Sequence, residues 1–185
     1  MTTTEILEKV TDFGDKAHGN QLRKYAPDRY MVHPVRVMQK RRTVSDDITV
    51  LTAALLHDVI EDTPVNRQEI ENYLSTLISP ELARKATELV VDLSDVYVKE
   101  SYPSLNRRQR KTKELERLKE IHPDAQTIKY ADILDNTQEI VVKNPAFARV
   151  YLREVKEVLQ NLTQGNSELH KEALEAVNAG LNQVR

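Results

Sequence analysis

Residues 53–63 of this 185-residue chain read AALLHDVIEDT, in which an apolar run passes directly into four acid/base or metal-ligating side chains. His57 and Asp58 are adjacent, and Glu61 and Asp62 each follow one of them after four residues. Because four residues make about one turn of an α-helix, the two pairs are expected on roughly the same face. So much polar chemistry behind a Leu-Leu pair that should be buried indicates a functional site.

The sequence on both sides of this stretch has helical spacing. Asp46 or Asp47 can cap a helix that runs through to His57, and Thr63-Pro64 ends it. Upstream, a stripe from Ile6 to Ala17 follows the cap-competent Thr3 and Thr4, and a short helix starts at Pro34. Downstream, helices are expected at 67–77, 81–92, 104–120, 125–142, 145–160 and 167–181, with loops at 20–32 and 95–105.

Glycine and proline placement supports the same architecture. The chain has only four glycines and seven prolines. Four of the prolines fall at or near expected helix starts, where a missing N–H costs little: Pro80, Pro103, Pro123 and Pro145. The sequence therefore predicts an all-α fold, a compact bundle of eight or nine helices, in a single domain over residues 1–185.

Composition excludes several classes of function. A net charge of −2, from 27 basic and 29 acidic residues, gives no global field for a nucleic acid polymer. The absence of cysteine excludes disulfides, thiolate catalysis and Cys-type zinc sites. The longest apolar stretch, 48–56, has about half the length that spans a bilayer. With no signal-peptide pattern at residues 1–8, a cytoplasmic protein without membrane contact is expected.

Four side chains have the chemistry of a metal site for phosphate hydrolysis. Such a site needs a few imidazoles and carboxylates, with coordination positions open to water and substrate. The candidates are His33, His57, Asp58 and Asp132. The order His … His-Asp … Asp resembles the signature of the HD phosphohydrolase superfamily.

Four blocks narrow this resemblance to the alarmone hydrolases. These comprise the hydrolase half of the long RelA/SpoT proteins and the stand-alone small enzymes of the Mesh1 type. The blocks span about two thirds of the chain in the family's order: AHGNQLRK at 17–24, YMVHPV at 30–35, HDVIEDT at 57–63, and KYAD at 129–132 with Asn136.

The resemblance implies a role for each matching residue. One Mn²⁺ ion would be ligated by His33, His57, Asp58 and Asp132, a ligand set that also suits Fe²⁺ or Co²⁺. Glu61 and Asp62 would position and deprotonate the attacking water. Substrate contacts would come from Arg23, Lys24 and Asn136. The implied reaction removes the 3′-pyrophosphate of guanosine tetra- or pentaphosphate, giving GDP or GTP and pyrophosphate, in a stand-alone hydrolase.

Other polar residues have simpler interpretations. His18 is expected to be a packing or hydrogen-bonded histidine, and the basic run 107–113 a solvated helix face that could also reach a pyrophosphate tail. Tyr97 and Tyr102 could stack on a purine or pack on the bundle. Asp135, residues 25–29 and the loop 92–105 depart from the family pattern, so guanine or adenine recognition stays open.

Two rival functions remain. An HD phosphohydrolase acting on another nucleotide, such as an adenosine alarmone, a nucleoside monophosphate or a dinucleoside, would share the metal ligands. It would differ at Arg23, Asn136 and residues 97–113. A non-catalytic domain of the same fold would be expected to lack ligands or the Glu-Asp pair, and all of these are present. A small nucleotide is thus the expected partner; the sequence also allows a homo-oligomer.

Overall fold

The computed structural model describes residues 1–184. Within these residues it has ten α-helices and no β-strand, with one isolated bridge between Leu22 and Arg29. The all-α prediction is confirmed for this part of the chain. Contacts group the chain into two compact units, an N-terminal unit (Met1–Ser94) and a C-terminal unit (Asp95–Arg185).

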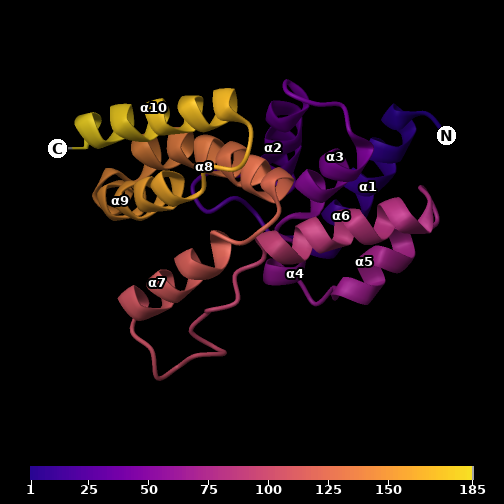
Figure 1. The fold of residues 1–185 in the computed structure, drawn as a ribbon, viewed down its shortest axis with the longest axis horizontal. Helices are drawn as coiled ribbons and strands as arrows, with labels where there is room; N and C mark the ends of the chain where they lie inside the picture. The colour runs from indigo at the N-terminus through magenta and orange to yellow at the C-terminus, as the bar shows by residue number, and fades with distance from the viewer. Residues whose placement is uncertain (185) are drawn as a thin grey trace. The chain divides into compact units, whose positions relative to one another are not determined.

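The N-terminal unit is built around a buried central helix, α3 (Figure 1). Its helices are α1 (Thr3–His18), α2 (Val32–Arg42), α3 (Ile48–Leu56), α4 (Val59–Asp62), α5 (Arg67–Leu74) and α6 (Pro80–Leu93). Helix α3 packs against α1, α2 and α6, and α5 packs on α6. Because α3 is enclosed on several sides, all its residues from Thr49 to Leu56 are buried. This burial fixes the position of the His-Asp pair that follows.

The start of α3 agrees with its sequence signals. The Asp47 carboxylate accepts a hydrogen bond from the Thr49 amide at 2.8 Å, so the predicted capping residue is confirmed. Inside the helix, the Thr52 hydroxyl donates to the Ile48 carbonyl at 2.8 Å and thereby satisfies its own buried polar group. An almost wholly apolar helix is tolerated here because its remaining surface meets other helices.

The end of α3 differs from the prediction. The helix ends at Leu56, and a separate short helix, α4, follows the His57-Asp58 turn. The backbone at Asp58 has φ −96° and ψ −6°, which departs from regular helix geometry and interrupts the ladder. This break raises the number of helices in residues 1–184 to ten, where eight or nine were predicted.

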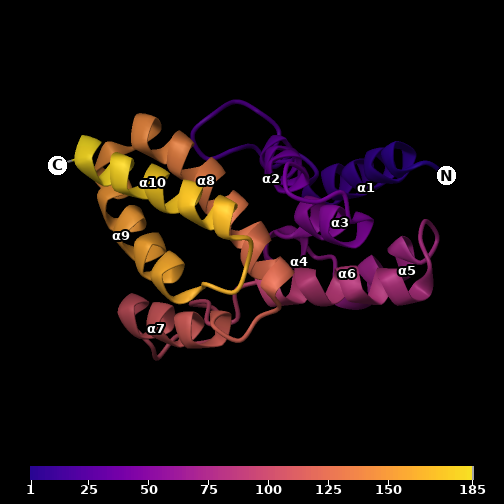
Figure 2. The same cartoon turned by 45° about the horizontal axis from the view of Figure 1, so that its top comes forward.

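The C-terminal unit contains three mutually packed helices and a fourth beside α9 (Figure 2). Its helices are α7 (Arg107–Leu118), α8 (Pro123–Lys143), α9 (Pro145–Asn161) and α10 (Ser167–Gln183). The fully buried Tyr130 of α8 donates to the Leu162 carbonyl at 2.7 Å. A Cβ at Gly165 would lie 2.6 Å from the Tyr130 ring, so glycine permits this close approach of the α9–α10 connection.

Helix boundaries shift where a cap lies outside the apolar pattern. Thr2, rather than Thr3 or Thr4, caps α1 through a capping box with Glu5. Helix α7 begins at Arg107 instead of residue 104, because Asn106 forms a capping box with Gln109. Among the described residues, no helix has both the length and the apolar character needed to cross a membrane.

Candidate metal centre

Three of the four predicted metal ligands lie together in the N-terminal unit. His33 comes from the first turn of α2, and His57 and Asp58 form the turn between α3 and α4. Their ligand atoms all lie within 4.8 Å of one another. Asp58 Oδ2 is 3.2 Å from His57 Nε2 and 3.7 Å from His33 Nε2. The cluster therefore offers two imidazole nitrogens and a carboxylate oxygen to one point.

A backbone carbonyl sets the orientation of His57. Its Nδ1 lies 2.8 Å from the Ala54 carbonyl oxygen, which can only accept, so Nδ1 carries the hydrogen. In the neutral ring, Nε2 then presents a lone pair toward Asp58. A cation bound between this nitrogen and the Asp58 carboxylate, which are 3.2 Å apart, would be attracted to both. This arrangement, with the second ring nitrogen held by a carbonyl, is typical of metal-ligating histidines.

Both imidazoles of the cluster are almost fully buried. His33 is 1% exposed and His57 is 2% exposed, and their ring centroids lie 5.3 Å apart. Asp58 is only partly buried, with 20% of its side chain exposed. Asp58 stands at the N-cap position of α4, yet its side chain makes no capping hydrogen bond. The carboxylate instead faces the histidines, and the donor set fits a divalent ion.

The hydroxyl of Tyr30 completes the surroundings of Asp58. It donates to Asp58 Oδ2 at 2.7 Å. Burial, together with the negative charges of Asp58 and Asp62, raises the pKa of Tyr30 above its ordinary range. The hydroxyl therefore keeps its proton and remains a donor. Tyr30 belongs to the YMVHPV block but was not predicted as a site residue, although its position three residues before His33 was a signal.

Glu61 and Asp62, the predicted water-activating pair, lie on α4 and are exposed. Gln21 Nε2 donates to Asp62 Oδ2 at 3.4 Å, and Gln21 Oε1 lies 2.9 Å from His18 Nδ1. His18 is buried and hydrogen-bonded, as predicted, and it holds the amide that reaches Asp62. Gln21 is a second site residue that was not predicted from the sequence.

Arg23 and Lys24, predicted to bind substrate, lie in the connection between α1 and α2. The Arg23 guanidinium carbon is 5.5 Å from the centroid of the Tyr30 ring. The Lys24 ammonium is 5.3 Å from the centroid of the Tyr25 ring. Arg23 is thereby close to the tyrosine that contacts Asp58, while the substrate contacts of both residues stay predictions.

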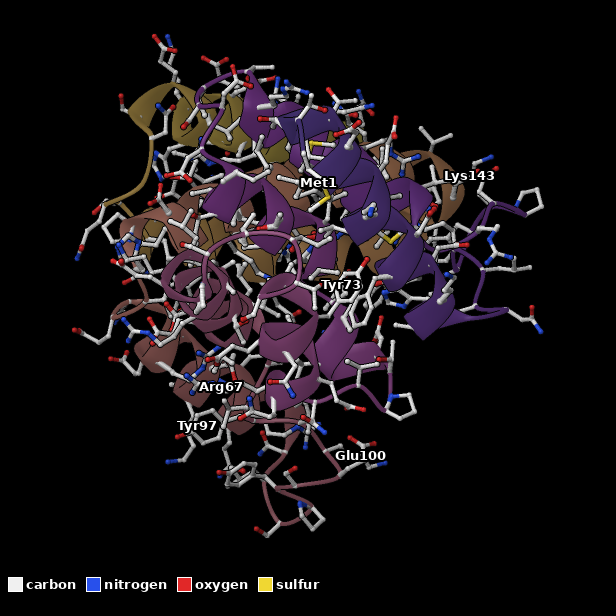
Figure 3. The ribbon with its side chains drawn as sticks, turned by 90° about the vertical axis from the view of Figure 1, so that its right-hand side faces the viewer. Met1, Arg67, Tyr73, Tyr97, Glu100 and Lys143 are labelled. Atoms are coloured by element: carbon white, nitrogen blue, oxygen red, sulfur yellow. The ribbon has the colours of Figure 1, made fainter. Side chains whose placement is uncertain are left out.

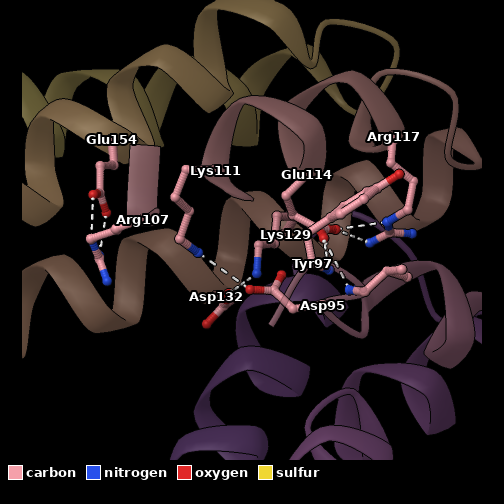
Figure 4. A network of polar contacts seen from close by, with 10 residues as sticks. Asp95, Tyr97, Arg107, Lys111, Glu114, Arg117, Lys129, Asp132 and Glu154 are labelled. Carbon is pink, nitrogen blue, oxygen red and sulfur yellow. Dashed lines mark hydrogen bonds and ion pairs between the residues drawn. The ribbon is translucent and has the colours of Figure 1, made fainter. Parts of the chain in front are cut away.

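Asp132 and Asn136, the remaining predicted site residues, lie on α8 in the C-terminal unit. Asp132 is 6% exposed, and Lys129 Nζ lies 2.9 Å from its Oδ2 (Figure 4). Asn136 Nδ2 donates to Asp132 Oδ1 at 2.6 Å. The structure thus brings Asn136 to a predicted ligand; the roles of Asp132 as a ligand and of Asn136 as a substrate contact stay predictions.

The 97–113 region is organised by a buried glutamate. Glu114 Oε2 accepts hydrogen bonds from the amides of Val96 and Tyr97, both at 2.9 Å, and its Oε1 accepts from Arg117 (Figure 4). Tyr97 and Tyr102 have ring centroids 4.8 Å apart, so each packs on the other. In the basic run, Arg107 pairs with Glu154 at 2.7 Å and Lys111 with Asp95 at 3.3 Å.

The chain is similar to known hydrolases over most of its length. The human protein named guanosine-3′,5′-bis(diphosphate) 3′-pyrophosphohydrolase MESH1 is 31% identical over 74% of this chain and 69% of that protein. A solved structure titled "A metazoan ortholog of SpoT hydrolyzes ppGpp and plays a role in starvation responses" superposes with a TM-score of 0.77 and 26% identity. That match covers 95% of this chain and 96% of the other.

Longer bacterial proteins match over a shorter stretch. A probable GTP pyrophosphokinase of Mycobacterium leprae is 41% identical over 58 residues, which is 31% of this chain and only 7% of that protein. The model of the HD domain matches residues 30–137, which include His33, His57, Asp58 and Asp132. The match covers more than half of the chain and every predicted metal ligand, and the chain belongs to the HD domain family.

Proposed function

We propose that this protein is a metal-dependent hydrolase that removes the 3′-pyrophosphate from guanosine tetra- or pentaphosphate, giving GDP or GTP and pyrophosphate. The observation that carries the proposal is the 31% identity to the human 3′-pyrophosphohydrolase across 69% of that protein. The cluster of His33, His57 and Asp58 supports it, because its ligand atoms lie within 4.8 Å of one another.

The proposed metal ion is Mn²⁺, held by His33, His57 and Asp58, with Asp132 as the fourth ligand. Fe²⁺ and Co²⁺ suit the same imidazole and carboxylate ligands. Two neutral imidazoles and two carboxylates cancel the charge of a divalent ion, so an incoming phosphate meets a site of about zero net charge. When bound, such an ion polarises a phosphoryl oxygen and lowers the pKa of water.

Glu61 and Asp62 are the proposed acceptors of the water proton. They follow the ligand pair by four residues, and their exposure leaves them open to solvent water. Gln21 restrains the Asp62 carboxylate through a 3.4 Å hydrogen bond. Arg23 and Lys24 supply positive charge for the phosphates or the base, and Asn136 contacts the sugar or a phosphate.

The two compact units are proposed to form one HD phosphohydrolase domain over residues 1–185. The HD match supports this, because residues 30–137 cross the boundary at Ser94. The cytoplasm is the proposed compartment, consistent with a chain that has no cysteine. A nucleotide is the proposed partner, and a homo-oligomer stays a prediction.

A different nucleotide is the alternative substrate. The loop between α6 and α7 and residues 25–29 depart from the alarmone hydrolase pattern, and both lie among the segments expected to recognise the nucleoside. An adenosine alarmone, a nucleoside monophosphate or a dinucleoside would use the same metal ligands.

A substrate panel separates the two readings. The Mn²⁺-loaded protein is incubated in parallel with guanosine tetraphosphate, its adenosine counterpart and guanosine monophosphate, and the released phosphate species are identified. The proposal expects pyrophosphate from guanosine tetraphosphate. Release of single phosphate from the monophosphate, with guanosine tetraphosphate intact, would favour the alternative.

A further inference from the structure

We propose that Tyr30 is a positioning residue that fixes the Asp58 carboxylate in the orientation needed to bind the metal ion. The inference rests on the proposed metal centre and adds to it a residue outside the ligand set. Its three supports are the hydrogen bond from the Tyr30 hydroxyl, the packing of the Tyr30 ring, and the backbone link from Tyr30 to His33.

The Tyr30 hydroxyl contacts the oxygen of Asp58 that faces the two histidines. Tyr30 donates to Asp58 Oδ2 at 2.7 Å, and this same oxygen is the one nearest to the two imidazoles, at 3.2 Å from His57 Nε2 and 3.7 Å from His33 Nε2. A carboxylate oxygen has two lone-pair directions, so Oδ2 can accept from Tyr30 and still bind a cation. A hydroxyl bond to an ionised carboxylate is also stronger than a bond between neutral groups.

The ring of Tyr30 is held in place by its neighbours. The His18 ring stacks on it with a centroid distance of 4.4 Å and an interplanar angle of 27°. The Arg23 guanidinium carbon lies 5.5 Å from the Tyr30 ring centroid. Because the ring is packed, the position of its hydroxyl is fixed. The hydroxyl can therefore restrict the rotation of the Asp58 carboxylate.

The backbone of Tyr30 connects to a second metal ligand. The Tyr30 amide donates to the Gln21 carbonyl at 3.0 Å, and the Tyr30 carbonyl accepts from the His33 amide at 3.0 Å. One residue thereby joins His33 on α2, through its main chain, to Asp58 on the α3–α4 turn, through its side chain. This link sets the spacing of ligands that come from two different elements.

The Tyr30→Phe variant removes the hydroxyl and keeps the ring that stacks on His18. Loss of the outer hydrogen bond to a ligand typically weakens metal binding by about 10–100-fold. We expect that loss in the dissociation constant for Mn²⁺, measured by calorimetric titration of the metal-free protein without substrate. The Tyr30 hydroxyl also interacts with Asp62, one of the proposed water-activating carboxylates, so the affinity for Mn²⁺ and not the turnover is the deciding measurement.

Tyr73 offers a matched control in the same unit (Figure 3). Its hydroxyl donates to the Lys9 carbonyl at 2.7 Å, and its ring stacks on Phe13 at 4.2 Å. Tyr73→Phe thus removes a tyrosine hydrogen bond of similar length that involves no carboxylate. It should change the melting temperature about as much as Tyr30→Phe while leaving Mn²⁺ affinity at the wild-type value.

The outcomes separate this proposal from the proposed function. A Tyr30→Phe protein with wild-type Mn²⁺ affinity would overturn the role of Tyr30 and leave the metal centre standing. Equal weakening in both variants would also overturn it, because the effect would then follow from general loosening of the unit. A wild-type protein that binds no Mn²⁺ would overturn the metal centre itself, and the role of Tyr30 with it.

Discussion

His57 shows how one local backbone contact can define the chemistry of a side chain. The Ala54 carbonyl, three residues earlier, accepts a hydrogen bond from His57 Nδ1, so that Nε2 faces Asp58. Because that carbonyl belongs to the buried part of α3, the imidazole has little freedom to turn. The backbone of α3 thereby restricts the geometry of this pair of adjacent residues.

Glu61→Gln should keep the fold and the metal while losing most of the turnover. The amide has nearly the shape of the carboxylate but cannot take the proton of water, and general base catalysis contributes about 10²–10⁴-fold. Steady-state kinetics together with Mn²⁺ content per protein checks this. Glu81→Gln, an exposed change on α6, serves as the control, and full activity in Glu61→Gln would contradict the assigned role.

Asp132→Ala should abolish metal binding and activity together, as should His57→Ala. The physical reason is the loss of one of the four proposed ligands. Asp135→Ala, three residues further along α8, removes a carboxylate outside the proposed ligand set and should retain the metal. Metal content after dialysis distinguishes them. Wild-type metal content in Asp132→Ala would show that Asp132 is not a ligand.

At the scale of elements, helix capping explains most differences between expected and observed boundaries. Apolar spacing predicts where a helix buries its face, and it gives no information about the residue that begins it. Asn106 was therefore missed as the start of α7, whereas Asp47 next to an apolar run was found. The break at Asp58 was also missed, because the helical spacing of residues continues from α3 into α4 across the turn.

The loop before α7 was predicted, but its anchor was not. Glu114 binds the amides of Val96 and Tyr97, which lie 18 and 17 residues away in sequence. Nothing in the local pattern around a helical glutamate indicates contact with backbone at that separation. The buried carboxylate is 3% exposed and connects the loop firmly to α7.

Glu114→Gln should loosen this loop. The glutamine side chain keeps one acceptor oxygen but loses the negative charge. The hydrogen bonds from the backbone N–H groups of Val96 and Tyr97 and from the Arg117 side chain should therefore all weaken. We expect a loss of about 1–3 kcal/mol in the free energy of unfolding and faster hydrogen exchange at the amides of Val96 and Tyr97. Glu116→Gln, an exposed change on the same helix, is the control. Unchanged exchange at both amides would contradict the anchoring role.

At the scale of the whole molecule, the sequence predicts the helices and the candidate site residues better than it predicts the tertiary contacts between them. The motif order identified His33, His57 and Asp58, and the structure brings these three together. The Tyr30–Asp58 bond links residues 28 apart, and its existence depends on how α2 packs on α3. The boundary between the two units at Ser94 coincides with the start of the predicted loop 95–105, but a loop by itself does not indicate that the contacts divide there.

Metal binding should stabilise the folded protein by mass action. At a free Mn²⁺ concentration of 100 times the dissociation constant, the expected gain is about 2.7 kcal/mol in the free energy of unfolding. Urea denaturation with and without Mn²⁺ measures it. Asp58→Ala should show no such gain, since it lacks the carboxylate at the centre of the cluster. A gain of equal size in that variant would place the bound metal elsewhere.

The most direct test of the central claim is product analysis after incubating the pure protein with Mn²⁺ and guanosine tetraphosphate, with Asp58→Ala as the blank. We predict GDP and pyrophosphate in equal amounts from the wild-type protein and neither from the variant. Intact guanosine tetraphosphate in the presence of Mn²⁺-loaded wild-type protein, or equal cleavage by Asp58→Ala, would contradict the assignment.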